Sequence, residues 1–450
     1  MQSEWRDVQL GNVAQIRRGS SPRPIIDFMA NDGMPWVKIA DATQSNSRFI
    51  DSTKEFIKQE GVPRSVIVEK DDLILSNSGT AGLPKFMGLT ACVHDGWQVF
   101  KELDGIDKEF LYYTLINIRS RLLFNAYDST MKNLTLDMVR EAKINLPPLP
   151  IQKKIAHILS TLDEKIELNQ KINQTLEEIA QALFKSWFVD FDPVHAKAEC
   201  KSEQELETAA TKLGISKEIL DLFPSEFEES EMGMIPKGWN IVKFEDIASV
   251  RKGLSYKGKH KSENEDDTPM FNLGNFGRSG QYRPEKIAHY NGDYKDRHLI
   301  RGGQLMIANT DMTQDRIILG LPLLVPKLVD ADMIFTHHVF AIDFNSSDLE
   351  STLKYYIFYT FLNPKFREIA EGYATGTTVL ALPKDGVMQF NLLLATDKVI
   401  ESFNEIVHEL VEKMISNKSE IETLQKTRDT LLPKLLSGEL DVSEIGISNE

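Results

Sequence analysis

Two short segments of the 450-residue chain combine arginine and lysine with hydroxyl groups, a combination that can bind phosphate. They are IRRGSSPRP (16–24) and SVRKGLSYKGKHK (249–261), and the second contains no acidic residue. Arginine and lysine contact DNA phosphates and can also donate hydrogen bonds to the edge of guanine. A solvated basic loop is the alternative interpretation. The candidate contacts are Arg17, Arg18, Arg23, Arg251, Lys252, Tyr256, Lys257, Lys259 and Lys261.

Two polar loops, SNSGTAG (76–82) and ANTDMTQ (308–314), follow runs that are typical of strands. Asparagine in such a loop can read adenine and hydroxyl groups can contact phosphate, but both are also common in ordinary turns. The further candidates in and beside these loops are Ser76, Asn77, Ser78, Thr80, Lys85, Asn309 and Thr310.

Motifs that would indicate catalysis are incomplete. GLSYKGKH (253–260) lacks the final Ser or Thr that places a hydroxyl group on magnesium in a P-loop. Pro284-Glu285 with Asp293 and Lys295 matches an Asp/Glu-x-Lys nuclease core, in which carboxylates hold magnesium and lysine steadies the attacking hydroxide. Solvated turn residues are the simpler interpretation of that match.

Two other patterns also fail as sites. NPKF (363–366) has Lys365 where the loop of adenine methyltransferases has proline, and it is interpreted as the end of a helix. The nine histidines show no metal-ligand spacing, and the adjacent His337 and His338 are expected on opposite faces of a strand. The sequence therefore predicts no catalytic residue and no metal site in this chain.

An internal repeat of about half the chain length organises these segments. At an offset of 234, Trp5, Leu10, Ala14, Arg18 and Gly19 fall on Trp239, Phe244, Ala248, Lys252 and Gly253. At an offset of 232, DLILSN (72–77) matches QLMIAN (304–309). Short apolar runs bounded by turn residues predict strands, and 109–120 and 349–362 are predicted helices. Each copy is expected to be an α+β domain of about 150 residues.

A long amphipathic helix is predicted after each copy. Positions 155 to 187 step by alternating fours and threes and are mostly apolar, and adding 248 gives a second seam from 403 to 435. Asn169 and Asn417 occupy the same place in the two seams and are the candidate helix-register residues. If a pseudo-two-fold axis relates the copies, the helices run antiparallel and the two amides lie close together. Two unrelated core helices are the alternative. Pro433 is expected to kink or end the second helix.

The formal charge of −15 is unevenly distributed. Residues 1–150 carry 18 basic and 19 acidic side chains, as do residues 241–395, whereas 151–240 carry 10 and 17 and 396–450 carry 6 and 12. A polyanion would therefore meet the two nearly neutral blocks. With two cysteines, no signal peptide and no apolar run of 18 residues, we expect a cytoplasmic, reduced protein without a membrane segment.

Three segments resemble the specificity subunits of type I restriction–modification systems. The stretch 147–193, which contains KIAHILSTLDEKIELNQKINQTLEEIAQALFKSWFVDFDP, is similar to the central region of that family. GMIPKGW (233–239) resembles the entry to its second target-recognition domain, and 419–440 resembles its C-terminal helix. The resemblance covers essentially the whole chain, including the duplicated layout. It adds Lys132, Thr375 and Thr377 as DNA-contact candidates, since STMKNLT (129–135) lies opposite ATGTTVLALP (374–383), which lacks the lysine.

The resemblance implies an α+β fold in which two α/β target-recognition domains form a pseudo-two-fold repeat, separated by two long antiparallel coiled-coil helices. The expected boundaries are target-recognition domain 1 at 1–150, a central spacer helix at 151–190, an acidic linker at 191–235, target-recognition domain 2 at 236–395, a C-terminal spacer helix at 396–440 and a tail at 441–450. Phe184, Trp187, Phe188 and Phe191 are too dense for a two-helix seam, and either belong to the core or contact a partner.

The implied function is non-catalytic. Each domain reads one half of a bipartite, asymmetric site in double-stranded DNA, and the helices set the spacer. Two modification subunits would supply S-adenosylmethionine and methylate adenine. Restriction (motor-nuclease) subunits would add ATP- and Mg²⁺-dependent cleavage, so this chain binds no cofactor of its own. A stand-alone nuclease that uses Asp293 and Lys295, and a coiled-coil scaffold that binds no nucleic acid, are the alternatives.

Overall fold

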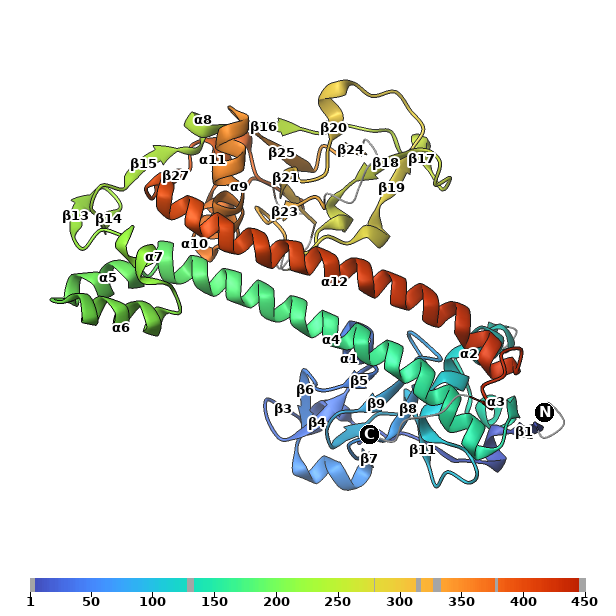
Figure 1. Ribbon diagram of the computed structural model, residues 1–450. Helices are drawn as coiled ribbons and strands as arrows, with labels where there is room; N and C mark the ends of the chain where they lie inside the picture. The colour runs from blue at the N-terminus through green and yellow to red at the C-terminus, as the bar shows by residue number, and fades with distance from the viewer. Residues whose placement is uncertain are drawn as a thin grey trace. The chain divides into compact units, whose positions relative to one another are not determined.

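The computed structural model describes residues 5–127, 133–278, 280–312, 317–326, 333–376 and 379–444. The chain divides into two compact units, which are described separately. Unit 1 comprises Met1–Ile172 and Ser416–Glu450, and unit 2 comprises Asn173–Ile415. Each unit therefore contains one copy of the repeat together with a part of each long helix (Figure 1).

Unit 1 contains two five-stranded sheets, ordered β3-β6-β4-β10-β7 and β2-β11-β8-β9-β5, and the two-stranded sheet β1-β12. The strands are β1 (Arg6–Gln9), β2 (Gln15–Arg18), β3 (Met29–Ala30), β4 (Met34–Val37), β5 (Phe49–Ile50), β6 (Glu55–Ile57), β7 (Val66–Val68), β8 (Leu73–Ser76), β9 (Pro84–Met87), β10 (Ala91–Val93), β11 (Trp97–Lys101) and β12 (Lys143–Leu146). The helices are α1 (Ile39–Gln44), α2 (Lys108–Tyr127) and α3 (Leu136–Arg140). The predicted helix over 109–120 is thus confirmed as part of α2, whose first turn Asp107 caps by accepting from the Phe110 amide at 3.0 Å.

Unit 2 repeats this arrangement, with the sheets β17-β19-β18-β24-β20, β16-β25-β21-β23 and β15-β27 and the added pairs β13-β14 and β22-β26. The strands are β13 (Phe227–Ser230), β14 (Gly233–Pro236), β15 (Asn240–Lys243), β16 (Ala248–Lys252), β17 (Lys261–Ser262), β18 (Thr268–Phe271), β19 (Ala288–Tyr290), β20 (Leu299–Ile300), β21 (Leu305–Ala308), β22 (Thr310–Asp311), β23 (Pro322–Leu324), β24 (Met333–Phe335), β25 (Val339–Phe344), β26 (Leu380–Ala381) and β27 (Asn391–Leu394). The helices of the unit are α5 (Asp192–Glu199), α6 (Glu203–Leu213), α7 (Lys217–Asp221), α8 (Phe244–Ile247), α9 (Ser347–Leu362), α10 (Pro364–Tyr373) and α11 (Lys384–Met388).

The repeat predicted from the sequence is confirmed by strand direction as well as strand order. The sheets β3-β6-β4-β10-β7 and β17-β19-β18-β24-β20 each contain one parallel pair. This pair occupies the same place in both sheets, β4 with β10 in unit 1 and β18 with β24 in unit 2. The neighbouring pairs, such as β10 with β7 and β24 with β20, are antiparallel in both units. The two copies therefore position their loops on equivalent frameworks.

The two long helices, α4 (Leu149–Phe188) and α12 (Asp397–Ser437), are antiparallel within each unit. In unit 1 the contacts run in opposite directions along the two sequences, from Lys154 with Ser443 to Asp163 with Arg428 and Asn169 with Glu420. In unit 2, Asn173 donates to the Met414 carbonyl. Every predicted seam position is buried or half-buried, which confirms the seam. The expected end of the helix at Pro433 is wrong, because α12 continues to Ser437.

Polar side chains attach unit 1 to its helices. Asp163, on α4, accepts from Arg428 Nη1 of α12 at 2.6 Å and from the Tyr113 hydroxyl of α2 at 2.7 Å. Arg48 is 6% exposed, and it contacts Glu167 of α4 at 3.3 Å through its guanidinium and at 2.7 Å through its backbone amide. A buried carboxylate and guanidinium are stable only when paired in this way.

Aromatic side chains attach unit 2 to its helices. Trp187 and Phe188 of α4 are buried against Phe403 of α12, with ring centroids 6.1 and 5.1 Å apart, and Phe188 also meets Tyr356 of α9 at 4.9 Å. Phe184 belongs to the same cluster, and Phe191 packs at its edge. Of the two interpretations of these four residues, the structure supports the core.

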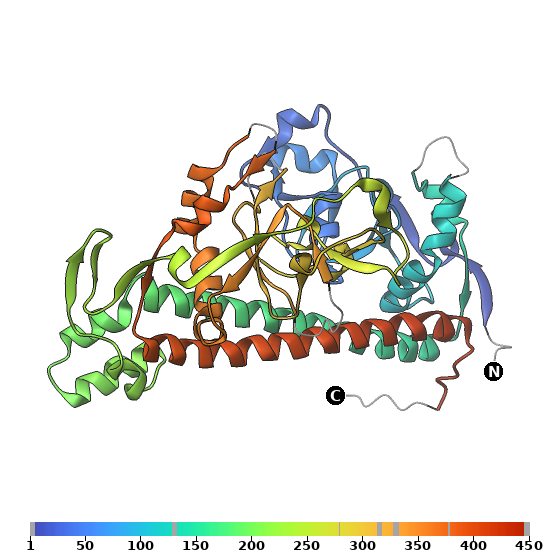
Figure 2. The same ribbon diagram turned by 90° about the horizontal axis from the view of Figure 1, so that it is seen from above.

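Among the described residues, one further part of unit 2 has no counterpart in unit 1. It consists of α5, α6, α7 and the β13-β14 hairpin, beside the end of α4 (Figure 2). Among the described residues, no helix is long and apolar enough to cross a membrane.

The Asp163–Arg428 pair predicts a specific pattern of stability. Asp163→Val removes the buried carboxylate that binds Arg428 and the Tyr113 hydroxyl and leaves Arg428 only its contact with Asp429, so it should lower the free energy of unfolding by about 3 kcal/mol. The repeat positions of Asp163 and Arg428 in unit 2 are Val411 and Ala180. We therefore expect Asp163→Val/Arg428→Ala to recover at least half of the loss in urea denaturation, whereas Lys426→Ala, an exposed control on α12, changes little. A double variant no more stable than the single one would contradict this.

Candidate nucleic-acid interface

The two basic segments occupy the same place in the two units. In unit 1 the segment leads from β2 to the edge strand β3, and in unit 2 from β16 to the edge strand β17. A side chain would not fit at its start, since a Cβ on Gly19 would lie 2.0 Å from the His94 carbonyl and one on Gly253 2.4 Å from the Phe335 carbonyl. Glycine lets the segment lie directly on the turn that follows β10 or β24.

In unit 1 the basic segment converges on Asp95 in that turn. Arg23 lies 3.3 Å and Arg18 3.8 Å from its carboxylate, and Ser21 donates to it at 2.7 Å. The Ser21 hydrogen bond, with Arg23 as a further cause, holds the pKa of Asp95 below its ordinary value. Arg17, Arg18 and Arg23 all remain exposed. Asp95 therefore orients the arginines without removing them from solvent.

The polar loop of unit 1 is occupied by internal contacts. Ser76 is buried, donating to the Thr80 carbonyl and accepting from the Leu83 amide, and Asn77 donates to the Asp95 carbonyl at 2.9 Å. Lys85 is 6% exposed and donates to the carbonyls of Ser45 and Ser47, and burial lowers its pKa to about 8. In this conformation Ser76 and Asn77 support the loop, Lys85 supports the segment 45–47, and Ser78 and Thr80 are the accessible hydroxyl residues of the loop.

Arg251 has a structural position in unit 2. Its guanidinium forms a bidentate pair with Asp343 of β25, at 2.8 and 3.0 Å, and donates to the Leu299 carbonyl at 3.0 Å. It also lies over the Phe335 ring. These contacts connect two sheets of unit 2, and they leave little of Arg251 for a ligand.

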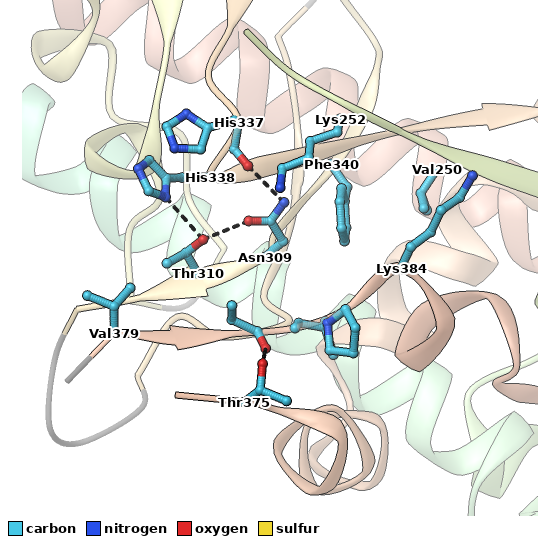
Figure 3. A pocket seen from close by; sticks show the side chains of 13 residues that line it. Val250, Lys252, Asn309, Thr310, His337, His338, Phe340, Thr375, Val379 and Lys384 are labelled. Carbon is cyan, nitrogen blue, oxygen red and sulfur yellow. Dashed lines mark hydrogen bonds between the residues drawn. The ribbon is translucent and has the colours of Figure 1, made fainter. Parts of the chain in front are cut away.

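Lys252, the next residue, points into an open groove of about 480 Å³ (Figure 3). Asn309, Thr310, His337, His338, Thr375 and Lys384 also line it, and none of the described lining residues is acidic. Asn309 and Thr310 are buried and bonded to one another at 2.7 Å, so they form the floor. A groove with two lysines and two histidines and no acid is suited to an anionic ligand.

The other cationic candidates of unit 2 lie on the segment that follows Lys252 in the chain. Lys257, Lys259 and Lys261 are exposed, and the Lys261 amine lies 5.5 Å from the Tyr256 ring centroid. Thr375 is exposed and pairs through its backbone with Ala381. Lys132 and Thr377 lie outside the described residues.

The sequence did not indicate that the turn after β10 or β24 belongs to the candidate interface. His337 and His338 lie in this turn, not on a strand, and their rings are 3.9 Å apart, so the expectation that they face opposite sides is wrong. An offset of 242, which aligns Trp97 with Val339, would have matched Asp95 and Gly96 with the two histidines. Lys384 was missed because it follows a proline in an unremarkable loop sequence.

Nothing in the described residues assembles the nuclease-like motif. Glu285 pairs with Arg283 at 2.9 Å, and Asp293 and Lys295 are exposed. No group of three His, Cys, Asp or Glu side chains in the described part of the chain could hold a metal ion. Asn363 of the NPKF segment ends α9 and caps α10, which confirms the predicted helix end.

Comparison with known proteins finds similarity to one family. Residues 2–178 match the family described as type I restriction modification DNA specificity domain. The chain is 25% identical to the type I restriction enzyme HindI specificity subunit of Haemophilus influenzae, over 97% of this chain and 100% of that one. It is also 25% identical to the MjaIX specificity subunit of Methanocaldococcus jannaschii, over 98% and 95% of the two chains.

A solved structure shares the fold. The S subunit of a type I restriction–modification system from M. genitalium superposes with a TM-score of 0.52 at 14% identity, covering 96% of each chain. This similarity supports the architecture of two α/β domains with long helices.

The contacts of Arg251 predict that it contributes more to stability than its exposed neighbour Lys252. Arg251→Ala removes a charge-assisted bidentate pair, and it should lower the stability of unit 2 by about 2 kcal/mol. Lys252→Ala, the matched control one residue away, should leave the thermal midpoint unchanged. Equal midpoints for the two variants would show that the Arg251 network contributes nothing measurable.

Proposed function

We propose that this chain is a specificity subunit of a type I restriction–modification system, and that each unit reads one half of a bipartite, asymmetric site in double-stranded DNA. The observation that carries this proposal is the repeated constellation of a basic segment, a polar loop and the turn after β10 or β24. The asparagine of the loop bonds to the turn in both units, Asn77 to Asp95 and Asn309 to His337. One recognition surface is thus built twice, with different side chains.

The helices support a role in setting the spacer between the half-sites. A helix of 40 residues such as α4 is about 60 Å long at 1.5 Å per residue. Successive major grooves on one face of DNA are about 34–36 Å apart. A pair of helices of this length can therefore carry two readers to separate grooves, with unread base pairs between them.

Partner subunits would supply the chemistry, because a specificity subunit is a non-catalytic subunit. We infer two modification subunits that bind S-adenosylmethionine and methylate adenine, and restriction subunits that use ATP and Mg²⁺ to cleave DNA in the cytoplasm. The excess acid of 190–231, with 12 acidic and 4 basic residues, would keep that segment away from phosphate. The nearly neutral domains would bind DNA weakly alone, so the partners would contribute much of the affinity.

Lys252 tests the groove of unit 2. Lys252→Ala should weaken binding of the assembled methyltransferase complex to its duplex and reduce the slope of log K against log salt by about 1, the value for one phosphate contact. Lys212→Ala on α6 removes the same charge from an exposed position outside the groove. Identical salt slopes for the Lys252 variant, the Lys212 control and the unaltered complex would contradict a phosphate contact at Lys252.

A change in helix length tests whether the helices set the spacer between the half-sites. We would insert seven residues after Ile172 in α4 and seven after Ile415 in α12, so that the antiparallel seam keeps its register. This adds about 10 Å, or about three base pairs, between the readers. Methylome sequencing should then find both half-sites unchanged and a longer spacer. Modification at the original spacer would contradict the role.

A further inference from the structure

A chain of hydrogen bonds in unit 2 determines which ring nitrogen of His338 carries a proton. The His337 carbonyl can only accept, so the Asn309 atom 3.1 Å from it is the amide nitrogen. The Asn309 amide oxygen then accepts the hydroxyl proton of Thr310, at 2.7 Å. Because that proton is used, Thr310 Oγ1 accepts from His338 Nδ1, at 3.1 Å. Neutral His338 is therefore protonated on Nδ1 (Figure 3).

The other ring nitrogen, Nε2, is then a hydrogen-bond acceptor. Within the described residues it has no hydrogen-bond partner, and His338 lines the groove. The ring is held on its second side by His337, with centroids 3.9 Å apart and the planes inclined by 40°. The acceptor is thus presented in a defined direction, as a base-reading group requires.

The surroundings of His338 favour the uncharged ring. Besides His338, the titratable and charged groups among the described lining residues are His337, Lys252 and Lys384. Asp311, the residue after Thr310, accepts from the Ile318 amide at 2.7 Å. Burial, followed by the neighbouring His337 and Lys252, holds the pKa of His338 below its ordinary value. Near neutral pH the ring therefore presents a lone pair and not a charge.

We propose that His338 is a specificity-determining residue that accepts a hydrogen bond from an exocyclic amino group in the major groove of DNA. The amino groups available there are N6 of adenine and N4 of cytosine. Guanine and thymine present only acceptors at the equivalent edge, so an acceptor at this position selects against them. The inference rests on the proposed function of unit 2 as the reader of a half-site.

Base preference at two pH values tests this proposal. The assembled complex with its modification subunits would select from duplexes randomised in the half-site that unit 2 reads. At about pH 8 we expect one position to prefer adenine or cytosine about tenfold. Once the pH is low enough to protonate His338, Nε2 becomes a donor, so that preference should fall or turn toward guanine or thymine. A pH effect that is equal for all sequences would indicate a phosphate contact and overturn the proposal.

Two variants of His338 distinguish the effect of the Nε2 acceptor from the effect of the aromatic ring. His338→Phe keeps an aromatic ring on His337 without an acceptor, and it should lose the preference at that position only. His338→Gln keeps an acceptor that does not titrate, and it should retain the preference at both pH values. Lys212→Ala, the exposed control on α6 outside the groove, should behave as the unaltered complex. An unchanged preference in His338→Phe would overturn the inference, whereas a complex that prefers no sequence would overturn the proposed function itself.

Discussion

The attachment of each α/β domain to the paired helices is the constraint on which the rest of the structure depends. A reader of a half-site is useful only if its surface keeps a defined position on its support, and that position is held by a few buried contacts. In unit 1 these are the Asp163 contacts to Arg428 and Tyr113. In unit 2 they are the aromatic contacts of Phe188 with Phe403 and Tyr356. The same geometry is thus stabilised by charge pairing in one copy and by aromatic packing in the other.

The attachment of the domain explains why the FKSWF stretch (184–188) has more apolar residues than a two-helix seam needs. A two-helix seam needs two apolar positions in seven, but the end of each long helix must also cover a domain. Leu432, Leu435 and Leu436 of α12 do this in unit 1, at the repeat positions of Phe184, Trp187 and Phe188. The extra apolar residues therefore belong to the domain contact, and the matched leucines in the other copy were the available signal.

The sequence predicted the framework better than the recognition surface. Periodicity and the internal repeat were sufficient for the helices, the antiparallel seam and the duplicated domains, because each rests on patterns of many residues. The site depends instead on single contacts between distant segments. Nothing in the spacing indicated that Arg251 would be bound by Asp343, 92 residues away, or that Lys85 would be buried. Cationic residues in adjacent positions, such as Arg251 and Lys252, are alike in composition and differ only in their partners.

The two recognition surfaces differ in chemistry although their backbones correspond. The amide of Leu134 donates to Asn77 in unit 1 and that of Leu382 donates to Asn309 in unit 2, so the same backbone bond supports both loops. Because the framework is held by backbone bonds and glycine contacts, the turn between the strands is free to vary. It carries Asp95 among arginines in one copy and His337 with His338 among lysines in the other. Two surfaces with different donors and acceptors on one framework are what an asymmetric site requires, since identical surfaces would read the same bases twice.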